Sequence, residues 1–233
     1  MIRQTTETPS GSLPEPMSVS GGVFIDDEAE ATLDHELIYG NTTDDGGGGI
    51  YVDGLDYTGS KVAVTHCTVA DNTGGSRGGN GLTAEGHSQV TITNSIFRGN
   101  SDGEDFTVDA TSDITVTYSL SEETISGTGN RSSDPLFVNA ASADYQLSSS
   151  SPAIDAGDPA SDYANEPAPN DGRVNMGRYG NTAEATSRML LEYAISILKI
   201  LTGTNAASVV SDMNNDDRIG LSEAVYVLQK LAR

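Results

Sequence analysis

The chain has 233 residues, with 34 acidic and 12 basic side chains and a formal net charge of −22. This charge argues against binding to nucleic acid or to anionic membranes, because no basic surface is present to neutralise phosphates. Aromatic residues make up 6% of the chain and tryptophan is absent, which argues against a large core built on aromatic rings. Cys67 is the only cysteine, so no internal disulfide can form, and its setting VTHCTV is typical of a buried strand thiol.

Residues 1–19 are polar and rich in proline, and we expect them to form a disordered or truncated N-terminal segment. They contain no apolar core of a signal peptide. Because a repeat begins abruptly after them, we expect the chain to be the C-terminal part of a longer secreted protein, located outside the cell or on its surface. The longest apolar stretch, residues 189–201, is too short to span a membrane.

Residues 20–147 contain a repeat of about 30 residues with no helical pattern. Three copies align without gaps, and a fourth is decayed: ATLDHELIYGN (31–41), VAVTHCTVADN (62–72), VTITNSIFRGN (90–100) and ITVTYSLSEE (114–123). Shorter matched segments precede the three copies: GGVFID (21–26), GGIYVD (48–53) and NGLTAEG (80–86). Each unit therefore consists of short strands of alternating polarity joined by turns rich in glycine and asparagine.

Such a unit cannot bury its apolar face alone, whereas stacked coils can, so the repeat predicts a parallel β-solenoid. Two inward-facing columns are predicted: Leu33, Val64, Ile92 and Val116, and then Leu37, Thr68, Ile96 and Leu120. The closing asparagines, Asn41, Asn72 and Asn100, are predicted to form a hydrogen-bonded ladder. A twisted β-sandwich is the alternative, but the recurrence of the same asparagine favours the solenoid.

Further segments carry a resemblance to a known family: GGGGIYVDG, ITNSIFRGN, DPLFVNAASADYQLSSSSPAIDAGDP and EPAPNDGRVNMGRYGNTAEAT. They resemble the right-handed parallel β-helix family of secreted bacterial proteins, many of which are pectate-lyase-like or adhesin-like. The resemblance covers about residues 20–186. It implies that residues 148–186 form the terminal rung, a cap and a linker.

Two histidines are candidates for catalysis, because His35 and His66 occupy the same position in successive repeats. A pair of stacked imidazoles could act as a general base or as a weak metal site. The alternative is a column of polar turn residues that bond from coil to coil. Asn94 and Tyr118 continue the same column, and they favour this alternative.

Carboxylates are the second set of catalytic candidates. Asp26, Asp53 and Asp56 fall about one coil apart and could present paired carboxylates to a glycosidic bond. Solvated acids at turns are the alternative, and Tyr51 and Tyr57 are the only nearby aromatic residues that could support a sugar ring. The sequence contains no catalytic triad, no phosphate-binding glycine loop and no zinc spacing of Cys and His.

The segment DMNNDDRIGLSE (212–223) has the spacing of a calcium loop. Asp212, Asn214, Asp216 and Glu223 stand at positions 1, 3, 5 and 12, and Arg218 at position 7 would offer its backbone carbonyl. Hard oxygen ligands in a flexible loop suit Ca²⁺, so we expect a bound Ca²⁺ ion. An acidic, solvated linker is the alternative.

Residues 187–233 place this loop between two predicted helices. The matching residues Asp212, Asn214, Asp216, Ile219, Gly220, Leu221, Glu223, Ala224, Tyr226, Leu228 and Gln229 resemble the dockerin-like C-terminal modules of bacteria. The resemblance implies a small all-α calcium-binding module with a cohesin-like or cell-surface partner. A full dockerin has two calcium loops, and this sequence has one.

The predicted fold class is mainly β, a right-handed parallel β-helix followed by the small all-α module. Two functions remain open. The first is an extracellular protein for carbohydrate binding, adhesion or surface display, tethered through the calcium module and monomeric. The second is the C-terminal part of a polysaccharide lyase or glycoside hydrolase acting on a plant or algal polysaccharide.

Overall fold

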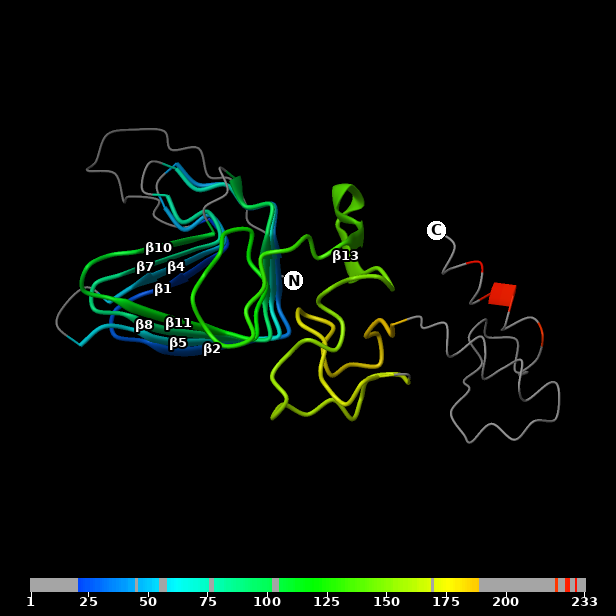
Figure 1. Ribbon diagram of the computed structural model, residues 1–233. Helices are drawn as coiled ribbons and strands as arrows, with labels where there is room; N and C mark the ends of the chain where they lie inside the picture. Colours follow the sequence, from blue (N-terminus) through cyan, green and yellow to red (C-terminus); the bar gives the residue numbers. More distant parts are fainter. Residues whose placement is uncertain are drawn as a thin grey trace.

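A computed structural model describes residues 21–188, except 45, 55–57, 76–77, 102–104 and 169, together with 221, 225–226 and 229. The described part is a parallel β-helix, in which strands of successive coils lie one above another in flat sheets (Figure 1). The prediction of this fold is therefore confirmed.

Three parallel sheets form the walls of the coils. The first contains β1 (Val23–Ile25), β4 (Ile50–Asp53), β7 (Leu82–Glu85) and β10 (Phe106–Val108). The second contains β2 (Glu30–Asp34), β5 (Lys61–Thr65), β8 (Gln89–Thr93) and β11 (Asp113–Thr117). The third contains β3 (Leu37–Tyr39), β6 (Thr68–Ala70) and β9 (Ile96–Arg98), and Leu120 continues it by a bridge to Ile96.

The second sheet contains the first of the two predicted inward columns. Leu33 pairs with Val64, Val64 with Ile92 and Ile92 with Val116. Val64 and Ile92 are completely buried in the core inside the coils. Because side chains alternate along a strand, the residues between them face outward. The prediction of this column is confirmed.

Both faces of the third sheet carry apolar residues, and the structure corrects the second predicted column. Ile38, Val69 and Phe97 belong to the core inside the coils, so their neighbours along the strands face outward. These neighbours are Leu37, Thr68, Ile96 and Leu120. They are nevertheless buried, because later segments of the chain cover them; Ile96, for example, packs with Ile154 in a separate apolar cluster.

The predicted asparagine ladder is present inside the coils. Asn41 donates from Nδ2 to Oδ1 of Asn72 over 2.9 Å, and Asn72 donates likewise to Asn100 over 3.0 Å. Asn100 then donates to Oδ1 of Asp105 over 2.8 Å, so a carboxyl group ends the ladder in the fourth coil. All four side chains are buried, so each amide group satisfies its neighbour where water cannot.

A second ladder uses backbone donors and side-chain hydroxyls at another corner. Cys67 donates from its backbone N to Oγ of Ser95 over 3.1 Å, and Ser95 donates to Oγ of Ser119 over 3.0 Å. The thiol of Cys67 is buried, as predicted, and burial raises its pKa to about 12. A thiol in this state is a small apolar side chain rather than a nucleophile.

The chain closes the β-helix with a hairpin and an irregular segment. Strands β12 (Phe137–Asn139) and β13 (Asp144–Leu147) pair in antiparallel fashion around the 3-10 helix η2 (Ala140–Ser142). Residues 148–188, apart from 169, which we call the closing segment, then lie beside the coils (yellow-green to orange in Figure 1). Backbone hydrogen bonds hold the segment together, including one of 2.9 Å from Met176 N to Ala153 O.

The predicted calcium ligands lie outside the described residues: Asp212, Asn214, Asp216, Arg218 and Glu223. The predicted N-terminal segment of residues 1–19 also lies outside them. Within the second helix predicted for the calcium module, the described residues are Leu221, Val225, Tyr226 and Gln229, and each is helical.

Candidate functional site

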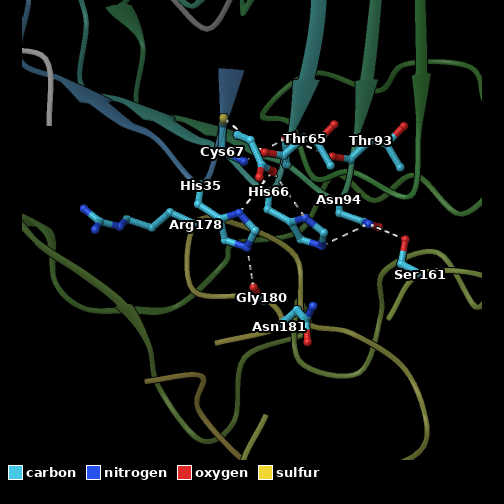
Figure 2. A network of polar contacts seen from close by, with 12 residues as sticks. His35, Thr65, His66, Cys67, Thr93, Asn94, Ser161, Arg178, Gly180 and Asn181 are labelled. Atoms are coloured by element: carbon cyan, nitrogen blue, oxygen red, sulfur yellow. Dashed lines mark hydrogen bonds and ion pairs between the residues drawn. The ribbon is translucent and has the colours of Figure 1, made fainter. Parts of the chain in front are cut away.

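The two candidate histidines meet at one corner of the coils, where the chain turns from the second sheet into the third. His35 and His66 both adopt left-handed backbone conformations, with φ values of 57° and 48°, and Asn94 and Tyr118 do the same in the next coils. The imidazole rings of His35 and His66 stack with their centroids 4.8 Å apart and their planes 20° from parallel. Figure 2 shows the two rings side by side, with Asn94 beyond them.

The closing segment docks on this corner through hydrogen bonds. The Nε2 atom of His35 lies 2.8 Å from the carbonyl oxygen of Gly180. Asn94 donates from Nδ2 to Oγ of Ser161 over 2.9 Å, and its Oδ1 accepts from the backbone N of Asp158 over 2.6 Å. The closing segment therefore docks on this column of polar turn residues, which we call its seat. The residues in contact are more than 60 positions apart in the sequence.

His66 is the more buried of the two histidines, with 7% of its surface exposed. Its Nε2 lies 3.2 Å from Nδ2 of Asn94, whereas its Nδ1 is buried and has no hydrogen-bond partner among the described residues. Burial, followed by the charge of His35, lowers the pKa of His66 to about 4. The ring is therefore neutral at physiological pH.

Asp34 completes this cluster, although no sequence pattern had indicated it as a site residue. Its Oδ1 lies 3.0 Å from Nδ1 of His35 and 3.9 Å from Nδ1 of His66. The three atoms lie within 4.8 Å of one another. Asp34 ends strand β2 immediately before the turn, so the same backbone turn places the carboxylate beside both rings.

The candidate carboxylates lie at a different corner, after the first sheet. Ile25 pairs with Val52, so Asp26 and Asp53, the residues that follow them, stand in adjacent coils. Asp53 pairs in turn with Glu85, whose Oε2 accepts a hydrogen bond of 2.7 Å from Tyr51 Oη. Asp56 lies outside the described residues.

A pocket that the sequence did not predict opens between the coils and the hairpin. Its volume is about 360 Å³, and its lining residues are Asp71, Arg98, Gly99, Asp134, Leu136, Phe137, Ala140 and Tyr145. The rings of Phe137 and Tyr145 meet edge to face with centroids 5.2 Å apart, and the ring centroids of Tyr39 and Tyr145 are 5.4 Å apart. We call the cavity formed by the eight lining residues the hairpin pocket.

Polar groups face the same pocket. Tyr145 donates from Oη to Oδ2 of Asp71 over 2.6 Å, and Arg98 forms an ion pair of 3.9 Å with Glu122. Burial and the bond to Asp71 raise the pKa of Tyr145 above its usual range, so it stays a neutral donor. Because Asp71 and Tyr145 are 74 positions apart, no local sequence pattern could have indicated this pocket.

A broader groove runs over the outer face of the second sheet. Its volume is about 580 Å³, and it is lined by Glu30, Ala31, Thr32, Lys61, Val62, Ala63, Gln89 and Thr91. At the edge of the groove, Nζ of Lys61 lies 4.0 Å from Oε1 of Glu30. This groove offers hydroxyl, amide and charged groups, but its lining includes no aromatic ring.

The β-helix is also recognised by comparison with known families. A family described as the right handed beta helix region matches residues 12–129, which is just over half of the chain. No curated protein and no solved structure gives a significant match. In the described part of the chain, no helix has the length and apolar character that a membrane span requires. The family match and the in-register parallel coils agree, and the chain belongs to the right-handed β-helix family.

Proposed function

We propose that this chain is a non-catalytic, extracellular carbohydrate-binding protein whose sugar site is the hairpin pocket. The observation that carries the proposal is the meeting of aromatic rings with Asp71 and Arg98 in one hollow of about 360 Å³. Sugar rings present C–H faces that pack on aromatic side chains and hydroxyls that bond to carboxylates and guanidinium groups. A pocket of this size and mixed character is typical of a small-ligand site.

The geometry of the pocket supports recognition rather than catalysis. Asp71 already accepts the hydroxyl proton of Tyr145, which fixes its orientation and leaves further lone pairs for a sugar hydroxyl. Phe137 is only partly buried, so part of its ring remains available for contact. The guanidinium of Arg98, which forms an ion pair with Glu122, adds N–H donors that can bond to sugar hydroxyls.

Binding is tested by calorimetric titration of the full chain with neutral and acidic oligosaccharides. We expect one class of sites, weakened at least tenfold by Phe137→Ala or Asp71→Asn. Tyr163→Phe is a matched control, because this partly exposed tyrosine lies in the closing segment and not in the hairpin pocket. Equal affinity in all variants, or no binding to any sugar, would remove the pocket from consideration.

A second candidate function is hydrolysis or elimination on a polysaccharide, and one observation favours it. Asp53 and Glu85 are register partners in neighbouring parallel strands, so their side chains stand in adjacent coils on one face of the sheet. Glycosidases act through a pair of carboxyl groups. Release of reducing or unsaturated sugar from a polysaccharide panel, lost in Asp53→Ala, would favour this function over simple binding.

We further propose that residues 187–233 tether the protein through a Ca²⁺-binding, dockerin-like module to a cohesin-like or cell-surface partner. The support is the spacing of Asp212, Asn214, Asp216 and Glu223 in the sequence, with the backbone carbonyl of Arg218 between them. A tether of this kind suits a protein that binds carbohydrate outside the cell.

A further inference from the structure

The cluster of Asp34, His35 and His66 has the dimensions of a metal site. In a tetrahedral site with ligands about 2.0–2.1 Å from Zn²⁺, neighbouring ligand atoms lie about 3.3 Å apart. The distances from Asp34 Oδ1 to the Nδ1 atoms of His35 and His66 are 3.0 Å and 3.9 Å, on either side of this value. All three residues offer ligand atoms within 4.8 Å of one another, so rotation of the side chains would bring them around one ion.

An unsatisfied atom points into this cluster. Nδ1 of His66 is buried without a hydrogen-bond partner among the described residues, and the whole residue is 7% exposed. A buried polar atom left in this state costs about 1–3 kcal/mol. A metal ion that displaces the proton on Nδ1 and binds the nitrogen would remove this cost.

The ring of His35 also presents a nitrogen lone pair to this cluster. The carbonyl oxygen of Gly180 can only accept, so Nε2 of His35 must carry a proton. In the neutral ring, Nδ1 then holds a lone pair, and it faces a carboxylate oxygen of Asp34 only 3.0 Å away. Nδ1 of His35 and Oδ1 of Asp34 are therefore placed to bind the same metal ion.

We propose that Asp34, His35 and His66 form a binding site for a borderline divalent metal ion of the Zn²⁺ class. Two imidazole nitrogens and one carboxylate oxygen are the ligand types that Zn²⁺ takes in proteins, with solvent in the fourth position. The bond from His35 Nε2 to the Gly180 carbonyl is the outer contact that orients a metal-bound histidine. The site is independent of the proposed sugar pocket, because the two share no residue.

Binding requires two adjustments. The rings lie only 20° from parallel, so one of them must turn for a single ion to lie in both planes. His35 is the more exposed ring, and Nε2 lies closer than Nδ1 to its Cβ–Cγ axis, so a turn about that bond moves Nδ1 further than the atom that contacts Gly180. In addition, Asn94 presents an N–H to Nε2 of His66, which favours a proton on Nδ1 that the metal must displace.

Asn94 is a positioning residue, because its side chain influences which nitrogen of His66 carries the proton. Its replacement should therefore change the affinity for the metal. Replacing Asn94 by aspartate would turn the donor that faces His66 Nε2 into an acceptor, while Oδ1 could still accept from Asp158 N. His66 would then carry its proton on Nε2 and offer a lone pair at Nδ1. Contacts of this outer type change metal affinity by about 10- to 100-fold, so Asn94→Asp should bind the metal about tenfold more tightly.

The test is a calorimetric titration of the full chain with Zn²⁺ in excess Ca²⁺, which occupies the many carboxylates that prefer a hard cation. We expect one equivalent of Zn²⁺ to bind, with at least about 100-fold weaker binding in His66→Asn and in Asp34→Asn. His87→Asn is the matched control, because His87 also has a positive φ, of 65°, and lies outside the cluster. His66→Asn introduces the residue that the next coil already carries, and circular dichroism would verify that it folds.

Co²⁺ provides a readout that does not depend on affinity. Bound in place of Zn²⁺, it should give the visible absorption of a four-coordinate nitrogen and oxygen site, which His66→Asn abolishes and His87→Asn retains. Zn²⁺ binding that is unchanged in His66→Asn and Asp34→Asn would overturn the proposal. So would the absence of any Zn²⁺ binding in excess Ca²⁺ by both the wild type and Asn94→Asp.

Discussion

Asn72 donates from its side-chain amide to Oδ1 of Asn100 over 3.0 Å, although the two residues belong to different coils and both are buried. The same Nδ2 also donates to the carbonyl oxygen of Ile38 over 3.0 Å. One side chain thus joins three successive coils, because Asn41 donates to it from the other direction. The stack is held by these repeated contacts as well as by its apolar core.

Asn72→Ala should lower the free energy of unfolding by about 1–3 kcal/mol, because buried partners in the coils above and below lose their hydrogen bonds. Chemical denaturation followed by circular dichroism measures the loss. Asn139→Ala is the control, since Asn139 is exposed and its side chain donates locally to Ser142. A denaturation midpoint that is the same in both variants would contradict a buried ladder.

Asp105 should make the fold less stable as the pH rises. Burial is the main cause that raises the pKa of this carboxyl group from 3.8 to about 6, despite hydrogen bonds from Asn100 and from the backbone of Glu122. Between pH 4 and 6 the folded state therefore binds more protons than the unfolded chain, so stability falls as pH rises through this window. The loss should approach about 3 kcal/mol at pH 7.

Asp105→Asn removes this titration, so its unfolding free energy should depend less on pH than that of the wild type. The quantity to compare is the difference between the two proteins at pH 4 and at pH 7, because other carboxyl groups titrate equally in both. Asp134→Asn, at an exposed position, controls for the loss of one acidic group. Parallel pH profiles for wild type and Asp105→Asn would show that the buried carboxyl group is not perturbed.

Gly49 is required by the close approach of neighbouring coils. A Cβ atom at this position would lie 2.6 Å from the carbonyl oxygen of Gly81 and 2.7 Å from Cγ1 of Val69. Gly49→Ala must force the coils apart, and we expect a loss of about 1–3 kcal/mol or more.

Gly40 allows this steric effect to be separated from backbone strain. It has a φ of 64°, but a Cβ atom there would have no neighbour within 4 Å. Gly40→Ala should therefore cost only the strain of a left-handed conformation, about 1–2 kcal/mol. Denaturation midpoints of the two variants provide the comparison, and a larger loss for Gly40→Ala would contradict the steric explanation.

Ca²⁺ should increase the helical content of the full chain by ordering residues 212–232. The far-ultraviolet circular dichroism signal near the helical minimum should grow on addition of Ca²⁺ and fall again with a chelator. Glu223→Ala should abolish the change, because the terminal glutamate of such a loop binds through both oxygens. Glu184→Ala, an exposed acid outside the loop, should leave it intact, and a wild type that does not respond to Ca²⁺ would exclude the site.

The sequence alone was sufficient to predict the coiled fold, because stacked coils place similar residues at regular intervals along the chain. Recurrence of one residue type at one position, as at Asn41, Asn72 and Asn100, predicts that these side chains lie above one another. The alternation around Val64 and Ile92 likewise indicated the inner face of the second sheet. Both predictions concern contacts between equivalent positions in successive coils. Aligning the repeats shows which positions are equivalent.

Only the tertiary structure decided which face of the third sheet is inside. Leu37 and Ile38 are both apolar and adjacent, so period-two alternation cannot say which of them points into the coil. The outer of the two rows is buried because the hairpin and closing segment, far along the chain, cover it. The hairpin pocket, the seat of the closing segment and the buried Nδ1 of His66 arise from that same docking. They depend on contacts between non-equivalent positions, for which a linear sequence carries no periodic signal.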